Sequence, residues 1–278
     1  MRGEFESAEE PRTSEGEMYH VALGPEDVRR YALLPGDVER AEKIAAEWDE
    51  RRLVAKHREY VTYVGRYRGV DLMVTSTGIG GPAAAIAVDE LSRLGVDTFI
   101  RVGSTGAIRP EIELGDLVIS LGAVRLDGAS AQYVRPEYPA VAHYEVVMAL
   151  VEAAESLGYR YHLGITASTD SFYTGQGRRG CCGYWQSWMD DIIPDLQAAG
   201  VVNIEMEAAT IFTLASLFGK RAGAVCAVYA QRVRDEFAIA GEREAIKTAN
   251  EAVKILAEWD EVKRSADKRH FYPGLLRR

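Results

Sequence analysis

The chain has 278 residues, and its 47% hydrophobic and 27% charged residues are ordinary for a globular protein with a sizeable core. A formal net charge of -9 excludes a basic surface that coats nucleic acid, although it allows a local basic pocket. The sequence has no apolar run near the ~20 residues of a membrane span and no signal pattern at its start. The three cysteines, Cys181, Cys182 and Cys226, suggest no disulfide framework. We expect a cytoplasmic protein that binds neither membrane nor nucleic acid.

Composition divides the chain into a long central part and two tails. Residues 1–17 carry six glutamates and only one large hydrophobe, Phe5, which predicts a flexible acidic tail. Residues 18–263 have a globular composition and predict a single domain. Residues 264–278 form a C-terminal tail, and its aromatic residues Phe271 and Tyr272 predict docking on a surface.

Strands and helices are predicted to alternate along the central part. Apolar and β-branched runs predict strands at 31–34, 60–67, 70–77, 116–125, 161–167, 201–204 and 222–230. Residues 98–107 predict a buried strand whose carboxyl end opens into a glycine-rich loop. Helices are predicted at 38–48, 83–94, 142–157, 205–218 and 242–263. Residues 172–191 are rich in glycine and aromatic residues without periodicity, which predicts a functional loop. The alternation predicts one α/β domain with a central sheet.

Glycine-rich turns follow three of the predicted strands, at residues 35–37, 78–81 and 103–106. Glycine lets backbone amides approach an anion closely, and Arg40 and Arg101 lie beside two of these turns. The alternative is that the glycines only separate strand from helix. The turns contain neither the G-x-G-x-x-G pattern nor a P-loop lysine.

Arg101 stands inside the apolar strand 98–107, where a cation needs an anion as partner. That anion is either a carboxylate of the protein or a bound ligand, and the strand alone favours neither. Glu205 and Glu207 stand where a strand gives way to an apolar helix. They either favour the helix dipole or supply a half-buried carboxylate that accepts hydrogen bonds from sugar hydroxyls.

Phe172, Gln176 and Arg178 combine an aromatic face, an amide and a fixed cation within seven residues. Such a set suits a planar heterocycle that stacks and forms hydrogen bonds at its edge. The alternative is a solvated loop with one aromatic anchor.

Taken together, these motifs strongly resemble the trimeric and hexameric nucleoside phosphorylase family, and within it the members that cleave uridine. The resemblance runs from about residue 20 to about residue 257. The residues that carry it are Pro35–Asp37 with Arg40, His57–Glu59, Ser76–Pro82, Arg101–Gly106, Val124–Ala129, Phe172–Arg178 and Glu205–Glu207. It implies an α/β fold with a distorted central mixed β-sheet flanked by helices. It also implies phosphorolysis of uridine to uracil and ribose 1-phosphate.

The resemblance assigns roles to individual residues. It implies that phosphate binds Gly36, Arg40, Arg101 and Ser104, with Arg58 supplied by a neighbouring subunit. Ribose is expected at His20, Met206 and Glu207, with His20 also crossing the subunit boundary. The base is expected at Phe172, Gln176, Arg178, Glu205 and Arg232.

The implied chemistry needs no protein nucleophile, because the attacking phosphate is already an anion. His20 is therefore interpreted as a sugar ligand rather than a proton carrier, and His57 as structural. We expect no cofactor, with inorganic phosphate as co-substrate, and no metal, because the histidines and cysteines lack ligand spacing. The family implies a homo-oligomer, usually a hexamer built as a trimer of dimers, with sites shared between subunits.

Some residues bear on the choice of substrate. Purine-cleaving relatives use an aspartate near the end of the last strand, whereas here Tyr229–Arg232 is followed by no acid until Asp235. This favours a pyrimidine, with a purine nucleoside or methylthioadenosine phosphorylase as the alternative and a silent nucleoside binder as a third. Tyr229 and Ala230 replace expected aliphatic residues beside the base. Ala83 replaces a serine that helps to bind a monovalent cation in several relatives, so that ion is not expected although Glu59 is present.

Overall fold

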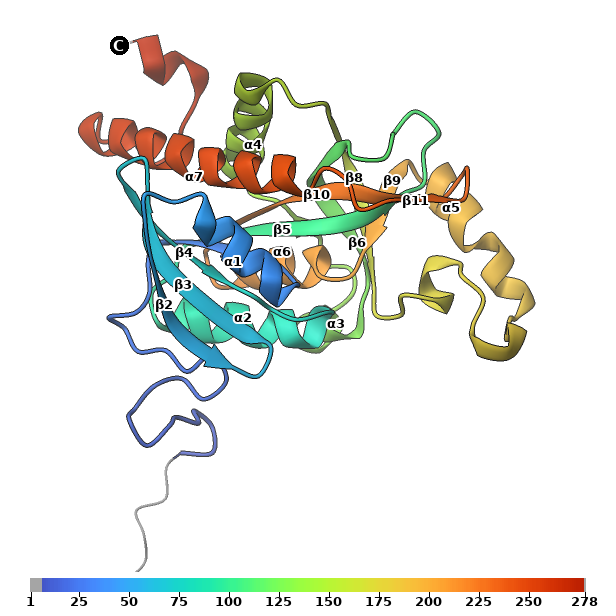
Figure 1. Cartoon of the computed structure of the whole chain (residues 1–278), viewed down its shortest axis with the longest axis horizontal. Coiled ribbons are helices and arrows are strands. Elements are labelled where there is room, and N and C mark those ends of the chain that lie inside the picture. The colour runs from blue at the N-terminus through green and yellow to red at the C-terminus, as the bar shows by residue number, and fades with distance from the viewer. Residues whose placement is uncertain (1–6, 278) are drawn as a thin grey trace, which may run out of the picture.

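The predicted strands pair into one mixed sheet in a computed structural model that describes residues 7–277 (Figure 1). The strands are β1 (Tyr31–Leu34), β2 (Glu50–His57), β3 (Tyr60–Tyr67), β4 (Val70–Thr75), β5 (Thr98–Ala107), β6 (Leu117–Leu126), β7 (Ala140–Val141), β8 (Tyr161–Thr169), β9 (Val201–Glu205), β10 (Arg221–Gln231) and β11 (Glu236–Phe237). Their order is β11-β10-β6-β8-β9-β5-β1-β4-β3-β2, with β7 beside β6. β1 lies parallel to β4 and β5, as expected for strands joined by helices.

β5 is the junction of the sheet. It pairs in parallel with β10 along most of its length and with β1 over residues 98–101, and its last two residues pair antiparallel with β9. The pairings from β10 through β6, β8 and β9 therefore return to β5 and close a circuit. This closure distorts the sheet, and the predicted mixed, helix-flanked α/β fold is confirmed.

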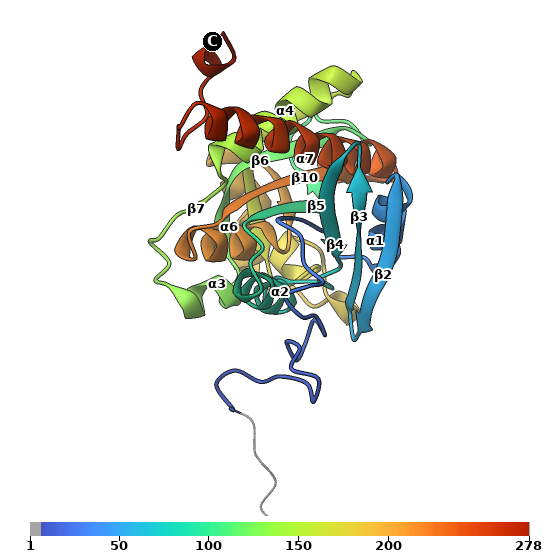
Figure 2. The same ribbon diagram turned by 90° about the vertical axis from the view of Figure 1, so that its left-hand side faces the viewer.

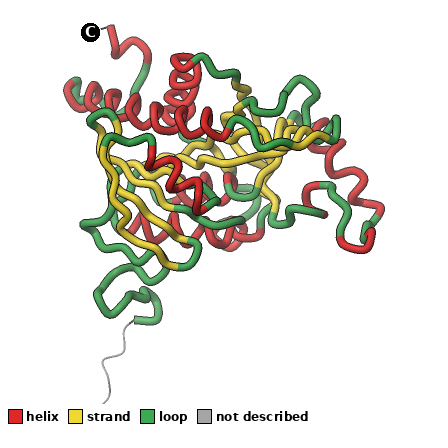
Figure 3. Tube along the Cα trace, viewed as in Figure 1, coloured by secondary structure: helices red, strands yellow, loops and turns green. Residues whose placement is uncertain are grey.

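Helices cover both faces of the sheet (Figures 1 and 2). The α-helices are α1 (Val38–Ala46), α2 (Gly81–Arg93), α3 (Gly128–Tyr133), α4 (Tyr144–Leu157), α5 (Ile192–Ala198), α6 (Ala208–Leu217) and α7 (Glu242–Ser265). α4 and α7 pack together on one face, while α2, α3 and α6 pack on the other. α6 is buried along most of its length because nearly all of its residues are apolar or small. Figure 3 shows the strands running between these two helical layers.

Residues 103–106 are predicted as a turn, and this prediction is wrong, because β5 continues through them to Ala107. Their backbone groups pair with β10, which has a register shift between Val228 and Ala230 opposite this stretch. Gly103 is required for a packing reason. A Cβ on Gly103 would lie 2.8 Å from both the Arg101 guanidinium and the Cys226 thiol. Arg101 is therefore in the middle of a strand, not at its end.

Several short or polar elements were not predicted. β2 has the sequence ERRLVAKH, whose many charged residues give no recognisable strand pattern, although it pairs with β3. α5 contains Pro194 and follows the aperiodic segment, while β7 and β11 have only two residues each. α3 is a single short helix capped by Asp127. Each of these elements depends on contacts with residues distant in sequence, so a local sequence pattern does not predict it.

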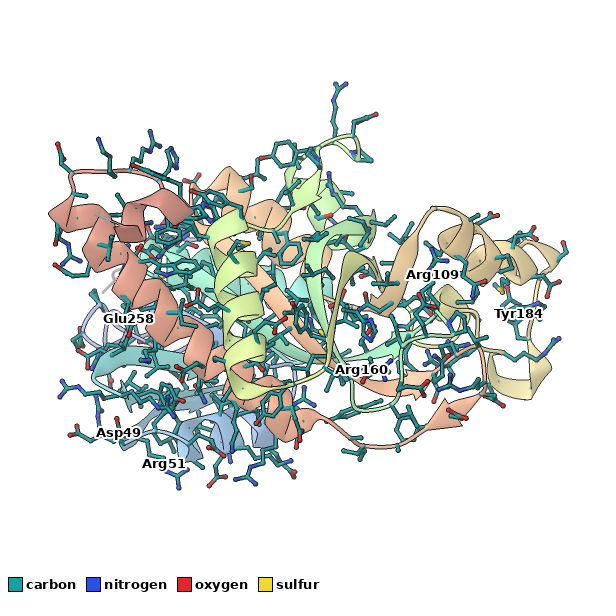
Figure 4. All side chains as sticks on the ribbon, turned by 90° about the horizontal axis from the view of Figure 1, so that it is seen from above. Asp49, Arg51, Arg109, Arg160, Tyr184 and Glu258 are labelled. Atoms are coloured by element: carbon teal, nitrogen blue, oxygen red, sulfur yellow. The ribbon has the colours of Figure 1, made fainter. Side chains whose placement is uncertain are left out.

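Residues 172–191, here called the flap, project from one end of the molecule. They form three short 3-10 turns, at Thr174–Gln176, Cys181–Gly183 and Ser187–Asp191. In Figure 4, Tyr184 of the flap lies at the opposite end of the molecule from Glu258 of α7. The Cys181 and Cys182 thiols are exposed and 3.5 Å apart.

The two tails differ. Residues 1–6 of the predicted acidic tail lie outside the described residues, and residues 7–17 include a turn closed by a bridge between Arg12 and Met18. At the other end, Phe271 is buried and stacks on Trp259 of α7 with ring centroids 4.1 Å apart. The C-terminal aromatic residues therefore dock on the domain.

A buried ion cluster fastens this C-terminal segment to the helices. The Glu145 carboxylate lies 2.6 Å from Lys263 Nζ and 3.0 Å from Arg221 Nη1, and it accepts a hydrogen bond from the Phe271 amide. Burial alone would raise the pKa of Glu145, but hydrogen bonds from Lys263, the Phe271 amide and Arg221 lower it to about 2. Asp260 joins the cluster, and its pKa is lowered in the same way.

We expect Glu145→Gln to reduce the free energy of unfolding at pH 7 by up to about 3 kcal/mol. A carboxylate with a lowered pKa stabilises the fold above its ordinary pKa of 4.5, and this contribution is lost as pH falls toward about 2. The difference from the unmodified chain, measured by guanidinium unfolding, should therefore shrink below pH 5. Glu152→Gln on the same helix, which makes no ion pair among the described residues, is the control. A difference that does not change with pH would contradict this account.

Candidate active site

A cavity of about 610 Å³ opens where β5, β9 and β10 meet the start of α1, the start of α6 and the flap. Most of the residues predicted for the site line it, namely Gly36, Arg40, Arg101, Ser104, Phe172, Gln176, Arg178, Glu205, Met206 and Glu207. Segments that are distant in sequence, from the start of α1 to the start of α6, thus come together to line one cavity. The cavity is large enough for a small molecule with an anion beside it.

The start of α1 forms the end of the cavity where phosphate is predicted to bind. Asp37 caps this helix by accepting a hydrogen bond from the Glu39 amide, so the chain leaves β1 through Gly36 and enters the helix directly. Arg40 follows in the first turn and is buried. Its guanidinium donates to Glu242 (3.0 Å), to the Val102 carbonyl (3.3 Å) and to the Tyr229 hydroxyl (3.1 Å). A helix N-terminus and a fixed arginine together favour a phosphate.

Arg101 has carboxylate partners within the protein. Its Nε lies 2.6 Å from Glu205 Oε2, and its Nη2 lies 2.5 Å from Glu207 Oε2. All three side chains are at most 5% exposed. Burial would lower the pKa of Arg101, but Glu207 and Glu205 raise it, so the guanidinium stays charged. The partner of Arg101 within the protein is therefore a pair of carboxylate side chains.

The two carboxylates are held by the backbone around the start of α6. Glu205 Oε2 accepts from the amides of Glu207 and Ala208, both at 2.9 Å, and Ser168 Oγ donates to its other oxygen. Glu207 Oε1 accepts from the Gly80 amide at 2.5 Å. Burial raises the pKa of Glu207, and Glu205 raises it further against the effect of Arg101. The glycine turn after β4 therefore binds a carboxylate of the protein.

The flap forms the end of the cavity where the base is predicted to bind. The Arg178 guanidinium lies 4.2 Å from the centre of the Phe172 ring and donates to Gln176 Oε1 at 2.6 Å. Arg232 donates to the Gln176 and Gly177 carbonyls from behind. Burial, followed by repulsion from Arg232, lowers the pKa of Arg178 to about 10. Arg178 therefore holds the side-chain oxygen of Gln176, and both side chains line the cavity.

His20 and Arg58 do not line this cavity. His20 Nδ1 lies 2.6 Å from Glu90 Oε1, and the His57 ring lies 3.0 Å from the His20 carbonyl. Arg58 occupies the turn between β2 and β3 with a positive φ of 54°, and its guanidinium lies 5.9 Å from the centre of the Tyr19 ring. The two residues predicted to serve a neighbouring subunit thus lie together, outside the cavity of their own chain.

Several lining residues were missed by sequence reasoning. They are Asp37, Val38, Ile79, Thr105, Gly106, Ile204 and Phe237. Thr105 is fixed by donating to the Ile204 carbonyl and accepting from Asn203. Ile79 and Phe237 are more than 70% exposed, so they form an apolar rim. β11 is too short to give a strand pattern, and no sequence signal marks Phe237.

Two further findings bear on ligands and location. Across residues 7–277, no group of three or more His, Cys, Asp or Glu side chains is placed to hold a metal ion. Within the same residues, no helix combines the length and apolar character needed to cross a membrane.

Comparison with known proteins identifies relatives. Residues 30–258 match the phosphorylase superfamily. The chain is 63% identical over 275 residues to the uridine phosphorylase of Thermococcus kodakarensis, covering 99% of each chain. It is 43% identical over 256 residues to that of Escherichia coli K12, covering 88% of this chain and 97% of the relative. It is also 43% identical over 209 residues to the guanosine phosphorylase of Halorubrum lacusprofundi, covering 75% of this chain and 81% of the relative. With its mixed sheet, its cavity and these matches, the chain belongs to the phosphorylase superfamily.

Proposed function

We propose that the chain is a pentosyltransferase that catalyses the reversible phosphorolysis of uridine to uracil and ribose 1-phosphate. One observation carries the proposal: a single cavity holds Arg40 and Arg101 at one end and Gln176 with Arg178 at the other. The relative that is 63% identical along the whole chain and is named uridine phosphorylase supports it. A silent nucleoside binder would not need both the phosphate-binding and the base-binding residues.

The reaction follows from the charges at the two ends of the cavity. A phosphate oxygen attacks C1′ of the ribose while the bond from C1′ to N1 of uracil breaks, and the base leaves with the bonding electrons. Positive charge on the ribose is stabilised by the phosphate held at Gly36, Arg40, Arg101 and Ser104. Negative charge on uracil is stabilised by Arg178 and by the amide of Gln176. Uracil then takes a proton from solvent.

Glu207 and Met206 are proposed to hold the ribose, with Phe172 stacked near the base and Arg232 and Glu205 behind. Because Glu207 pairs with Arg101, substrate binding is proposed to exchange partners: a ribose hydroxyl donates to Glu207, and phosphate takes the freed Nη2 of Arg101. Orientation of phosphate below C1′ supplies a further part of the rate enhancement.

We also propose that the enzyme is a homo-oligomer, a hexamer built as a trimer of dimers. The placement of His20 and Arg58 outside their own cavity supports this, because each could reach the ribose or phosphate of a neighbouring subunit. A cytoplasmic location is proposed from the three free cysteines. We propose no cofactor and no monovalent cation.

A panel of uridine, guanosine, inosine, adenosine and methylthioadenosine, each with and without phosphate, tests the activity. We expect rapid, phosphate-dependent loss of uridine only, measured by the change in ultraviolet absorbance. Guanosine is the second candidate, because the guanosine phosphorylase relative matches at the same 43% identity as the E. coli uridine phosphorylase. The lack of an acid in Tyr229–Arg232 favours uridine. Turnover without phosphate, or binding without turnover, would refute the proposal.

A further inference from the structure

We infer that Tyr229 is a positioning residue for phosphate, acting through the guanidinium of Arg40; this rests on the proposed function. Tyr229 lies near the end of β10 and lines the cavity. Its hydroxyl accepts a hydrogen bond from Arg40 Nη2 at 3.1 Å, and the Arg40 guanidinium carbon lies 5.8 Å from the centre of its ring. No role in the reaction as described above uses this hydroxyl.

The contacts of Arg40 show what the hydroxyl does. Each nitrogen of the guanidinium makes one contact: Nε with Glu242, Nη1 with the Val102 carbonyl and Nη2 with Tyr229. These partners come from α7, β5 and β10, so they fix the guanidinium plane from three sides. Each Nη still carries a second N–H, and a planar guanidinium presents these as a pair suited to two phosphate oxygens.

Glu242 and Tyr229 restrain Arg40 in different ways. Glu242 stands in the first turn of α7 and also binds Lys43 Nζ at 2.7 Å, so it neutralises charge as well as orienting Nε. Burial would raise the pKa of Glu242, but Lys43 and Arg40 lower it, so it stays ionised. Tyr229 is neutral, and burial raises its pKa. The hydroxyl therefore orients Arg40 without cancelling the positive charge that attracts phosphate.

Tyr229→Phe removes only the hydroxyl. We expect the KM for phosphate to rise about five- to tenfold, with kcat and the KM for uridine changed less than about twofold. Tyr138→Phe is the matched control, because it removes a hydroxyl that is hydrogen-bonded to Ser216 outside the cavity. It should leave all three constants unchanged. A rise in both KM values with Tyr229→Phe would overturn the inference, because it would indicate a general change in the cavity.

A double-mutant cycle tests whether the hydroxyl acts through Arg40. In an Arg40→Ala background, Tyr229→Phe should change the phosphate KM by less than about twofold. The same five- to tenfold rise there would overturn the inference, because the hydroxyl would then act without Arg40. Calorimetric binding of inorganic phosphate to the same four proteins repeats the cycle without uridine. It distinguishes failure of this inference from failure of the proposed reaction, since phosphate affinity is measured even if uridine is not cleaved.

Discussion

Arg101→Ala is expected to lower the free energy of unfolding by about 3–5 kcal/mol and to reduce kcat/KM for phosphate by at least about a thousandfold. Removal of the guanidinium leaves the Glu205 and Glu207 carboxylates buried beside each other without the cation that pairs with both. The same guanidinium is one of the proposed phosphate ligands, so one substitution affects stability and activity together. Guanidinium unfolding and a phosphorolysis assay at varied phosphate measure the two effects.

Glu207→Gln added to the Arg101→Ala variant separates the two effects. Neutralising one carboxylate should restore about 1–3 kcal/mol of the lost stability, because only Glu205 then stays charged at this position. Activity should not return, since the Arg101 guanidinium proposed to bind phosphate is still missing and the carboxylate proposed to bind ribose is now a neutral amide. If Arg101→Ala unfolds at the same denaturant concentration as the unmodified chain, the ion pairs do not stabilise the fold.

Arg178→Ala is expected to lower kcat/KM for uridine by about 10²–10³ while changing the phosphate affinity less than about twofold. Arg178 lies at the proposed base-binding end of the cavity, where its guanidinium lies over the Phe172 ring and donates to Gln176. Its loss removes the cation proposed to stabilise the departing uracil but leaves the proposed phosphate-binding end intact. Steady-state kinetics with each substrate varied in turn measure the two effects separately.

Arg179→Ala is the matched control for this prediction. The Arg179 guanidinium lies 5.2 Å from the centre of the Trp185 ring, within the flap, and does not line the cavity. We expect near-normal kinetics from this variant. If Arg178→Ala weakens phosphate binding as much as it slows uridine cleavage, the assignment of Arg178 to the base is wrong.

Much of the fold could be predicted from local patterns. β1 was predicted with correct limits because it is a continuous apolar run, the start of β5 was predicted correctly, and α1 was predicted to start after its capping residue Asp37. β2 could not be predicted, since its exposed charged residues become a strand only by pairing with β3. The turn predicted at residues 103–106 failed for a similar reason. Pairing with β10 holds these glycines in a strand that they would not form alone.

The residues of the site were grouped by family resemblance, and the structure places most of them around one cavity. The family resemblance could not predict the contacts that hold these side chains in place. Tyr229 is 189 residues from Arg40 in sequence, and Glu242 is 202 residues away. Contacts at such separations depend on the position of β10 in the sheet and of α7 on its face. A local sequence pattern does not predict either position. The pairing of Arg101 with two carboxylates could not be predicted either, because it depends on the start of α6 lying beside β5.

Gly103 limits how the cavity can be re-engineered. Any side chain there would meet the guanidinium of Arg101 and the thiol of Cys226 at 2.8 Å, which is too close for a carbon atom to occupy without moving one of them. A saturation library across β5 should therefore return only glycine at position 103 among active clones, while a library at an exposed position of β2, Arg51, should return many residues. Attempts to alter substrate choice should leave this strand unchanged and randomise the flap and the end of β10.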